Sequence, residues 1–201
     1  MSKSTGPNKE NFDKTNERFL AVARGEFIAH GFASASTNRM VEKSAMARGT
    51  LYYHFKDKRG IFAAVFKNLQ HEILTDIRAA ARNENDPWTG FKAACNRYLE
   101  LCARPDIRQI ILMDGPTVLD LRDIRLIEAE TTLGTLYEGI RGLSQRGYFK
   151  GLDPKPLSLL IYGALESAGR TVALSPDIAS RDATIHTLDA MLERLGSNGY
   201  I

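Results

Sequence analysis

The helical spacing of apolar residues constrains this chain more than any other feature. After Lys58, apolar side chains recur every three or four residues, at Ile61, Phe62, Val65, Phe66, Leu69, Ile73 and Ile77. That spacing places them on one face of an α-helix, whereas a half-buried strand would alternate apolar and polar residues. No sustained alternation occurs elsewhere in the 201 residues. The sequence therefore predicts an all-α fold of about nine helices.

Composition and helix signals divide the chain into three parts. Residues 1–15 are polar, and we expect a flexible arm there. Residues 16–60 hold three short helices, the second over about Thr37–Ser44 and the third over about Arg48–His54. The remaining residues, 61–201, are predicted to form a larger helical body. Its helices include one long stretch after Pro116 and others that open at Pro87, Pro154 and Pro176, because proline suits the first turn of a helix.

The charge of the chain is uneven. Residues 1–60 carry 11 Lys and Arg against 6 Asp and Glu, whereas residues 61–201 carry 16 against 18. A basic front on a near-neutral body is typical of nucleic-acid binding, although a solvated basic face would look the same. Met1 to Asn16 lack the apolar core of a signal peptide, and no apolar run is long enough to span a bilayer. We expect a cytoplasmic protein with no membrane partner.

The segment from Gly31 to Lys58 carries the functional signal. Two short helices joined by a three-residue turn match a helix-turn-helix, whose second helix enters the major groove of double-stranded DNA with its leading end. Arg48 has the forked guanidinium that pairs with guanine, and Gly49 allows the backbone to approach DNA closely. The helix dipole at the start of the next helix favours a phosphate at Lys58. Further candidates are Thr50 and His54 for phosphates, and Tyr52 and Tyr53 for the backbone or a thymine methyl.

This segment resembles the signature of the TetR (tetracycline repressor) family of bacterial regulators. The match is strongest over residues 49–58, and Met46, Met40, Ser36 and Gly31 fit without a gap. The resemblance implies an all-α homodimer held by its last two helices, with an N-terminal three-helix domain and a ligand-binding body. It implies repression of transcription until a small molecule binds that body. By resemblance, the DNA-contacting residues are Ser36, Thr37, Asn38, Arg48, Thr50, Tyr52, Tyr53, His54 and Lys58.

The sequence departs from the family pattern at the start of the recognition helix. Ala47 stands where a serine usually caps that helix, and the loss of such a cap costs about 1 kcal/mol. The departure concerns the placement of the helix and removes no group that faces DNA. The alternative interpretation is that Tyr52, Tyr53 and His54 are ordinary surface residues and that Arg48 is a solvated charge.

The body offers candidates for an effector pocket and for a dimer interface. Apolar or amphipathic residues that could line a pocket for a small organic effector are Trp88, Phe91, Cys95, Tyr98, Met113 and Tyr137, with plain core as the alternative. The last two helices carry Leu157, Leu160, Ile161, Leu165, Ile185, Leu188 and Leu192, which could pack in a four-helix bundle with a second copy or inside one chain. Cys95 and Cys102 are too far apart on one helix for a disulfide, so they are core residues or a redox pair across a dimer.

Other classes of function find little support. The sequence has no nucleophile elbow, no phosphate-binding loop, no zinc-protease motif and no glycine-rich dinucleotide loop, so we expect neither an enzyme nor a bound cofactor. The four histidines are scattered, which argues against a metal site. A ligand-responsive activator and a sequence-indifferent architectural DNA binder remain as alternatives to a repressor released from a palindromic operator.

Overall fold

The computed structural model describes residues 7–44, 46–175 and 177–196, and these ranges contain helices and connections but no strand. The all-α prediction is confirmed, with ten α-helices and one π-helix in the described ranges against the nine or so expected. The helices are α1 (Pro7–Ser34), α2 (Thr37–Ser44), α3 (Arg48–Phe55), α4 (Lys58–Arg82), α5 (Pro87–Cys102), the π-helix η1 (Ile107–Asp114), α6 (Gly115–Val118), α7 (Leu121–Glu130), α8 (Thr132–Ser144), α9 (Pro154–Leu174) and α10 (Ile178–Gly196).

The first helix is longer than the sequence predicts. It begins at Pro7, where a flexible arm over residues 1–15 was expected, so that prediction is wrong from residue 7 onward; residues 1–6 lie outside the described ranges. Proline has a fixed φ that suits the first turn of a helix, which is a start signal that the sequence analysis did not use here. At the other end, Gly31 kinks the helix with φ +66°, a left-handed conformation that glycine adopts at little cost.

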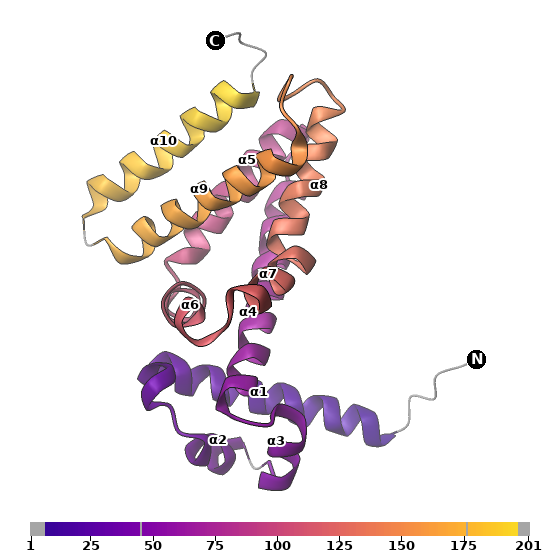
Figure 1. Cartoon of the computed structure of the whole chain (residues 1–201), viewed down its shortest axis with the longest axis vertical. Helices are drawn as coiled ribbons and strands as arrows, with labels where there is room; N and C mark the ends of the chain where they lie inside the picture. The colour runs from indigo at the N-terminus through magenta and orange to yellow at the C-terminus, as the bar shows by residue number, and fades with distance from the viewer. Residues whose placement is uncertain (1–6, 45, 176, 197–201) are drawn as a thin grey trace.

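Aromatic side chains hold the first three helices around the start of α4. The rings of Phe27 and Phe62 meet edge to face with centroids 5.2 Å apart, and those of Phe19 and Phe55 stack at 5.3 Å. Figure 1 shows α1, α2 and α3 gathered at one end of the molecule, with α4 rising from among them into the body. The helix α4 is therefore one continuous element shared by both parts of the chain.

The body is built from α4 and α5 with α8, α9 and α10 packed beside them, and α7 lies near the junction with the N-terminal part (Figure 1). The single long stretch predicted after Pro116 is wrong, because two breaks divide it. Leu119 is extended and buried between α6 and α7, and Thr131 leaves helical geometry between α7 and α8. The Thr131 hydroxyl donates to the Ile127 carbonyl at 2.7 Å, so local hydrogen bonding stabilises the second break.

Candidate nucleic-acid interface and cavity

The helix α3 has one buried face and one exposed face. Leu51 and Phe55 face inward with exposed fractions of 0% and 9%, whereas Tyr53 is 83% and Tyr52 49% exposed. The other candidates on its outer face are Arg48, Gly49 and His54, which are exposed, and Thr50, which is half-buried. Large aromatic side chains are usually buried on folding, so two exposed tyrosines on one short helix are an unusual feature of this surface.

The leading ends of α2 and α3 lie side by side. Arg48 Nη2 donates a hydrogen bond of 2.9 Å to Asn38 Oδ1, which joins the first turns of the two helices at the surface. Ser36 caps α2, because its Oγ accepts from the Arg39 N–H at 3.4 Å. The structure therefore brings Ser36, Thr37 and Asn38 to the same end of the motif as Arg48.

A buried carboxylate that the sequence analysis missed anchors α2 to α1. Glu26 is 3% exposed, and its Oε1 accepts from the Ser36 N–H at 3.0 Å and from Arg39 Nε at 2.7 Å. The hydrogen bond from Arg39 lowers the pKa of Glu26 although burial alone would raise it. The signal available in the sequence was the position of Glu26 between Ala23 and Phe27, on the apolar side of α1.

Lys58 has partners within the protein. It is half-buried at the start of α4, and its Nζ donates to the carbonyls of Ala33 at 3.1 Å and Ala35 at 3.2 Å. The same ammonium lies 4.7 Å from the centroid of the Phe32 ring. Lys58 thus links the end of α1 and the α1–α2 connection to α4 through hydrogen bonds. A phosphate contact at this residue stays a prediction.

The N-terminus of α3 has no side-chain cap. Ala47 occupies the cap position with φ −65° and ψ 137°, the backbone conformation that a capping residue adopts, but its methyl group accepts no hydrogen bond. The amides of the first turn of α3 are consequently left for other partners. This agrees with the departure from the family pattern noted in the sequence.

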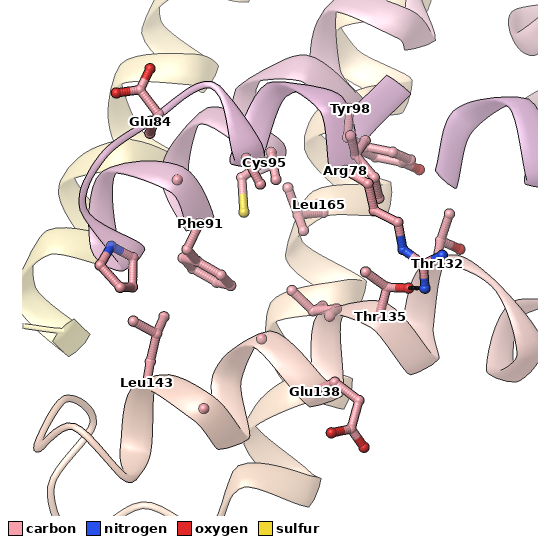
Figure 2. A pocket seen from close by; sticks show the side chains of 18 of the residues that line it. Arg78, Glu84, Phe91, Cys95, Tyr98, Thr132, Thr135, Glu138, Leu143 and Leu165 are labelled. Atoms are coloured by element: carbon pink, nitrogen blue, oxygen red, sulfur yellow. Dashed lines mark hydrogen bonds between the residues drawn. The ribbon is translucent and has the colours of Figure 1, made fainter. Parts of the chain in front are cut away.

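A cavity of about 430 Å³ opens between α4, α5, α8 and α9 in the body. Three of the six predicted pocket residues, Phe91, Cys95 and Tyr98, line it, as Figure 2 shows. Other lining residues, which the sequence analysis did not assign to a pocket, include Ile77, Ala94, Thr132, Leu136, Gly139, Leu143, Tyr162 and Leu165. Its volume lies in the range of small-molecule sites. Its walls are mainly apolar, and the lining also includes hydroxyl groups and the charged residues Arg78, Glu84, Asp86, Glu138 and Arg146.

The other three predicted pocket residues lie elsewhere. The Trp88 ring stacks on that of Tyr148 with centroids 5.2 Å apart, and its Nε1 donates to Glu193 Oε2 of α10 at 3.3 Å. Met113 is 46% exposed on η1, and Tyr137 is half-buried on α8 without lining the cavity. Helical spacing does not say which face of each body helix meets the cavity, and an effector contact at these three residues stays a prediction.

The two cysteines are free and buried. Burial raises the pKa of each thiol to about 12, so both are protonated at neutral pH. A thiolate is the reactive form of cysteine, and this environment therefore favours a packing role for Cys95 and Cys102 over a redox role.

Comparison with known proteins accounts for both parts of the chain. Residues 19–65 match the family of bacterial regulatory proteins named after tetR, and residues 88–195 match the tetracyclin repressor-like C-terminal domain. The chain belongs to the TetR family. It is accordingly a helix-turn-helix transcriptional regulator of a family whose members bind DNA, act as dimers and respond to small molecules; such regulators are not enzymes.

Individual relatives of the TetR family cover most of the chain. A TetR-family regulator from Pectobacterium atrosepticum superposes with a TM-score of 0.79 at 29% identity, covering 95% of this chain and 98% of its own. The regulator SrpR of Pseudomonas putida is 29% identical over 169 residues, 77% of each chain. A protein of Escherichia coli strain K12, named as a probable acrEF/envCD operon repressor, is 24% identical over 75% of this chain and 72% of its own.

The described residues of this TetR-family chain contain no group of three or more His, Cys, Asp or Glu side chains that could hold a metal ion. Within the same residues, every helix is too short or too polar to cross a membrane.

Proposed function

We propose that this TetR-family regulator is a homodimeric repressor that reads a palindromic operator with α3. The observation that carries the proposal is the outer face of α3, where Arg48, Tyr52 and Tyr53 are exposed while Leu51 and Phe55 hold the helix to the core. Such a helix fits the major groove, where base edges differ in their donors and acceptors. The proposed DNA contacts are Ser36, Thr37, Asn38, Arg48, Gly49, Thr50, Tyr52, Tyr53, His54 and Lys58.

The proposed dimer forms through α9 and α10. Leu159 and Leu160 of α9 are 52% and 72% exposed, Leu174 at its end is 51% exposed, and Ile178 at the start of α10 is 70% exposed. Packing this apolar surface against its symmetry mate would bury it in a four-helix bundle. A dimer would also set two α3 helices about one DNA turn apart, as a palindrome requires.

Small-molecule release is proposed to act through the junction between the two parts of the chain. The Phe32 N–H donates to Asp114 Oδ2 at 2.8 Å, and Arg59 Nε donates to the Val118 carbonyl at 3.1 Å. The proposed domains, residues 16–60 and 61–201, share α4 across their boundary. A ligand between α4 and α8 that favours one position of α4 would therefore change the spacing of the two α3 helices.

The experiment that tests DNA reading is selection of bound sequences from random duplex DNA. We expect a palindromic motif, since each half-site meets one α3. Binding of random and selected duplexes with equal affinity at the same salt concentration would instead identify an architectural binder. Transcription from a promoter that carries the motif should fall when the protein is added, and a rise would identify an activator.

Variants of α3 assign the contacts. We expect Arg48→Ala and Tyr53→Ala to weaken binding to the selected motif by about 1–3 kcal/mol, the usual value of a base-reading contact. Arg122→Ala is the matched control, because Arg122 is an exposed arginine of α7 in the body. The dimer is tested by Leu160→Arg in sedimentation analysis, which should shift the protein to monomers without loss of helical content.

A further inference from the structure

The first turn of α2 is held in place by a buried carboxylate of α1. Glu26 is 3% exposed, and its Oε1 accepts from the Ser36 N–H at 3.0 Å and from Arg39 Nε at 2.7 Å. Asn38 lies between these two residues, on the same helical turn, and it is exposed. The backbone that carries Asn38 is therefore fixed to α1, while its carboxamide is available at the surface.

The start of α3 lacks the constraint that a capping side chain would supply. Ala47 occupies the cap position without a side-chain hydrogen bond. The buried residues of α3 are Leu51 and Phe55, which follow its first three residues. Arg48, the first residue of the helix, is exposed, and an arginine side chain in solvent samples many rotamers. Its guanidinium consequently needs a partner to keep one orientation.

Asn38 supplies that partner across the turn of the motif. Arg48 Nη2 donates to Asn38 Oδ1 at 2.9 Å, although the two residues are ten positions apart. A guanidinium has two edges that can each offer a pair of N–H groups, and both edges include Nη2, which carries two hydrogens. Whichever of these hydrogens Asn38 accepts, the other edge keeps both of its N–H groups. The bond thus orients Arg48 and leaves it a complete pair of donors, which is what a guanine accepts.

We propose that Asn38 is a positioning residue for Arg48 and that the pair sets a preference for guanine at one position of each half-site. Asn38 orders the guanidinium before DNA arrives, so less rotamer entropy is lost when the fork pairs with guanine O6 and N7. The inference rests on the proposed function, in which α3 reads an operator. It adds the base that Arg48 recognises and the residue that orients it, and it is separate from a contact of Asn38 itself with DNA.

Base preference at one position of the operator measures this role. The selected duplex is remade with each of the four base pairs at every half-site position, and dissociation constants are measured by fluorescence anisotropy at one salt concentration. The position at which Arg48→Ala abolishes the preference is the one that Arg48 reads, and we expect guanine there with the wild type. In Asn38→Ala this preference should fall by about two- to tenfold, the range expected when a mobile side chain is ordered only on binding. Asn68→Ala, at an exposed asparagine of α4, is the matched control and should leave the preference unchanged.

Two further variants separate positioning from a direct contact. Asn38→Asp keeps an oxygen that accepts from Arg48 but loses the amide hydrogens that could donate to DNA. We expect this variant to keep the guanine preference while its affinity for all duplexes falls, because a carboxylate repels the phosphates. In the Arg48→Ala background, Asn38→Ala should cause no further loss of preference at this position, because no guanidinium is left to orient.

The outcomes separate this inference from the proposed function. If selection with the wild type returns no motif, or if Arg48→Ala changes the preference at no position, the role proposed above for Arg48 fails and the inference fails with it. If Arg48→Ala abolishes the preference at one position, an unchanged preference there in Asn38→Ala overturns the positioning role alone. Equal losses in Asn38→Asp and Asn38→Ala would also overturn it, since the accepting oxygen would then have no role. A base other than guanine at that position would contradict the assigned base.

Discussion

Arg39 of α2 donates a hydrogen bond of 2.7 Å from its Nε to Oε1 of Glu26, a buried residue of α1. The same oxygen accepts the Ser36 N–H just before α2, so one carboxylate orients the helix that precedes the recognition helix. We expect Glu26→Gln to lower the free energy of unfolding by about 1–3 kcal/mol, the value of hydrogen bonds to a charged group. Urea denaturation measures it. Glu42→Gln, an exposed carboxylate of α2, is the control and should change stability by less than about 0.5 kcal/mol.

The contribution of Glu26 should depend on pH. Its pKa in the folded state lies below the ordinary value of 4.5, so its stabilisation is complete above about pH 4.5 and is lost as the pH falls through the folded pKa. His30 at 3.8 Å and Lys43 at 3.9 Å face the same carboxylate and add to the attraction when charged. The stability difference between wild type and Glu26→Gln should therefore shrink in acid. A difference that grows below pH 4.5 contradicts the assignment.

A serine at residue 47 should stabilise the recognition helix. Ala47 already has the backbone conformation of a cap, so the Ser hydroxyl of Ala47→Ser can accept an amide of the first turn without rearrangement. The expected gain is about 1 kcal/mol, measured as a rise in the thermal midpoint. Ala79→Ser, at an exposed position inside α4, controls for serine itself and should be neutral or slightly destabilising. A rise of equal size in both variants would exclude capping as the cause.

Lys58→Ala should destabilise the N-terminal part of the chain. The variant removes two hydrogen bonds to the carbonyls of Ala33 and Ala35 and the contact with the Phe32 ring. We expect a loss of about 1–3 kcal/mol in the free energy of unfolding, measured by denaturation without DNA. Lys150→Ala, an exposed lysine of the body, should have almost no effect. Unchanged stability in Lys58→Ala would leave phosphate binding as the only role of this residue.

Thr132→Val tests the buried hydrogen bonds that link α8 to α4 and α9. Valine has nearly the same shape, but it leaves Gln70 Oε1 and the Tyr162 hydroxyl without the bonds that Thr132 Oγ1 makes. Because these groups are buried, we expect a loss of about 1–3 kcal/mol in unfolding free energy. Thr135→Val, which gives up only one bond to the exposed Arg78, should cost less than about 0.5 kcal/mol. Similar losses in both variants would argue against a specific contribution of the buried Thr132 hydrogen bonds to stability.

The sequence predicts local features of this molecule better than its tertiary contacts. The bounds of α2 agree with the prediction, and α3 extends one residue beyond it, because Ser36 and the short turn are signals within a few residues. The break at Thr131 was not predicted, since the stretch around it keeps an apolar helical spacing and the turn depends on packing. Pro7 shows the converse: a local start signal was present but was outweighed by the polar composition around it.

In the candidate site, too, local sequence patterns predict some features, whereas others depend on tertiary contacts. Exposure of Tyr52 and Tyr53 follows from the spacing of Leu51 and Phe55, so the outer face of α3 could be predicted from the sequence. The partners of Lys58 are carbonyls of residues more than twenty positions away, which no local pattern indicates. The cavity of about 430 Å³ likewise brings together residues of α4, α5, α8 and α9, a combination that no local pattern indicates.

Trp88 is the sole tryptophan of the chain, and it packs where the end of α10 meets α5. A Cβ at Gly196 would collide with the indole, so the last described residue of α10 rests directly on the ring. The tryptophan fluorescence of the unlabelled protein consequently reports whether α10 is packed against Trp88. Detachment of α10 would wet the indole and move its emission maximum to longer wavelength, making assembly and disassembly visible in a cuvette.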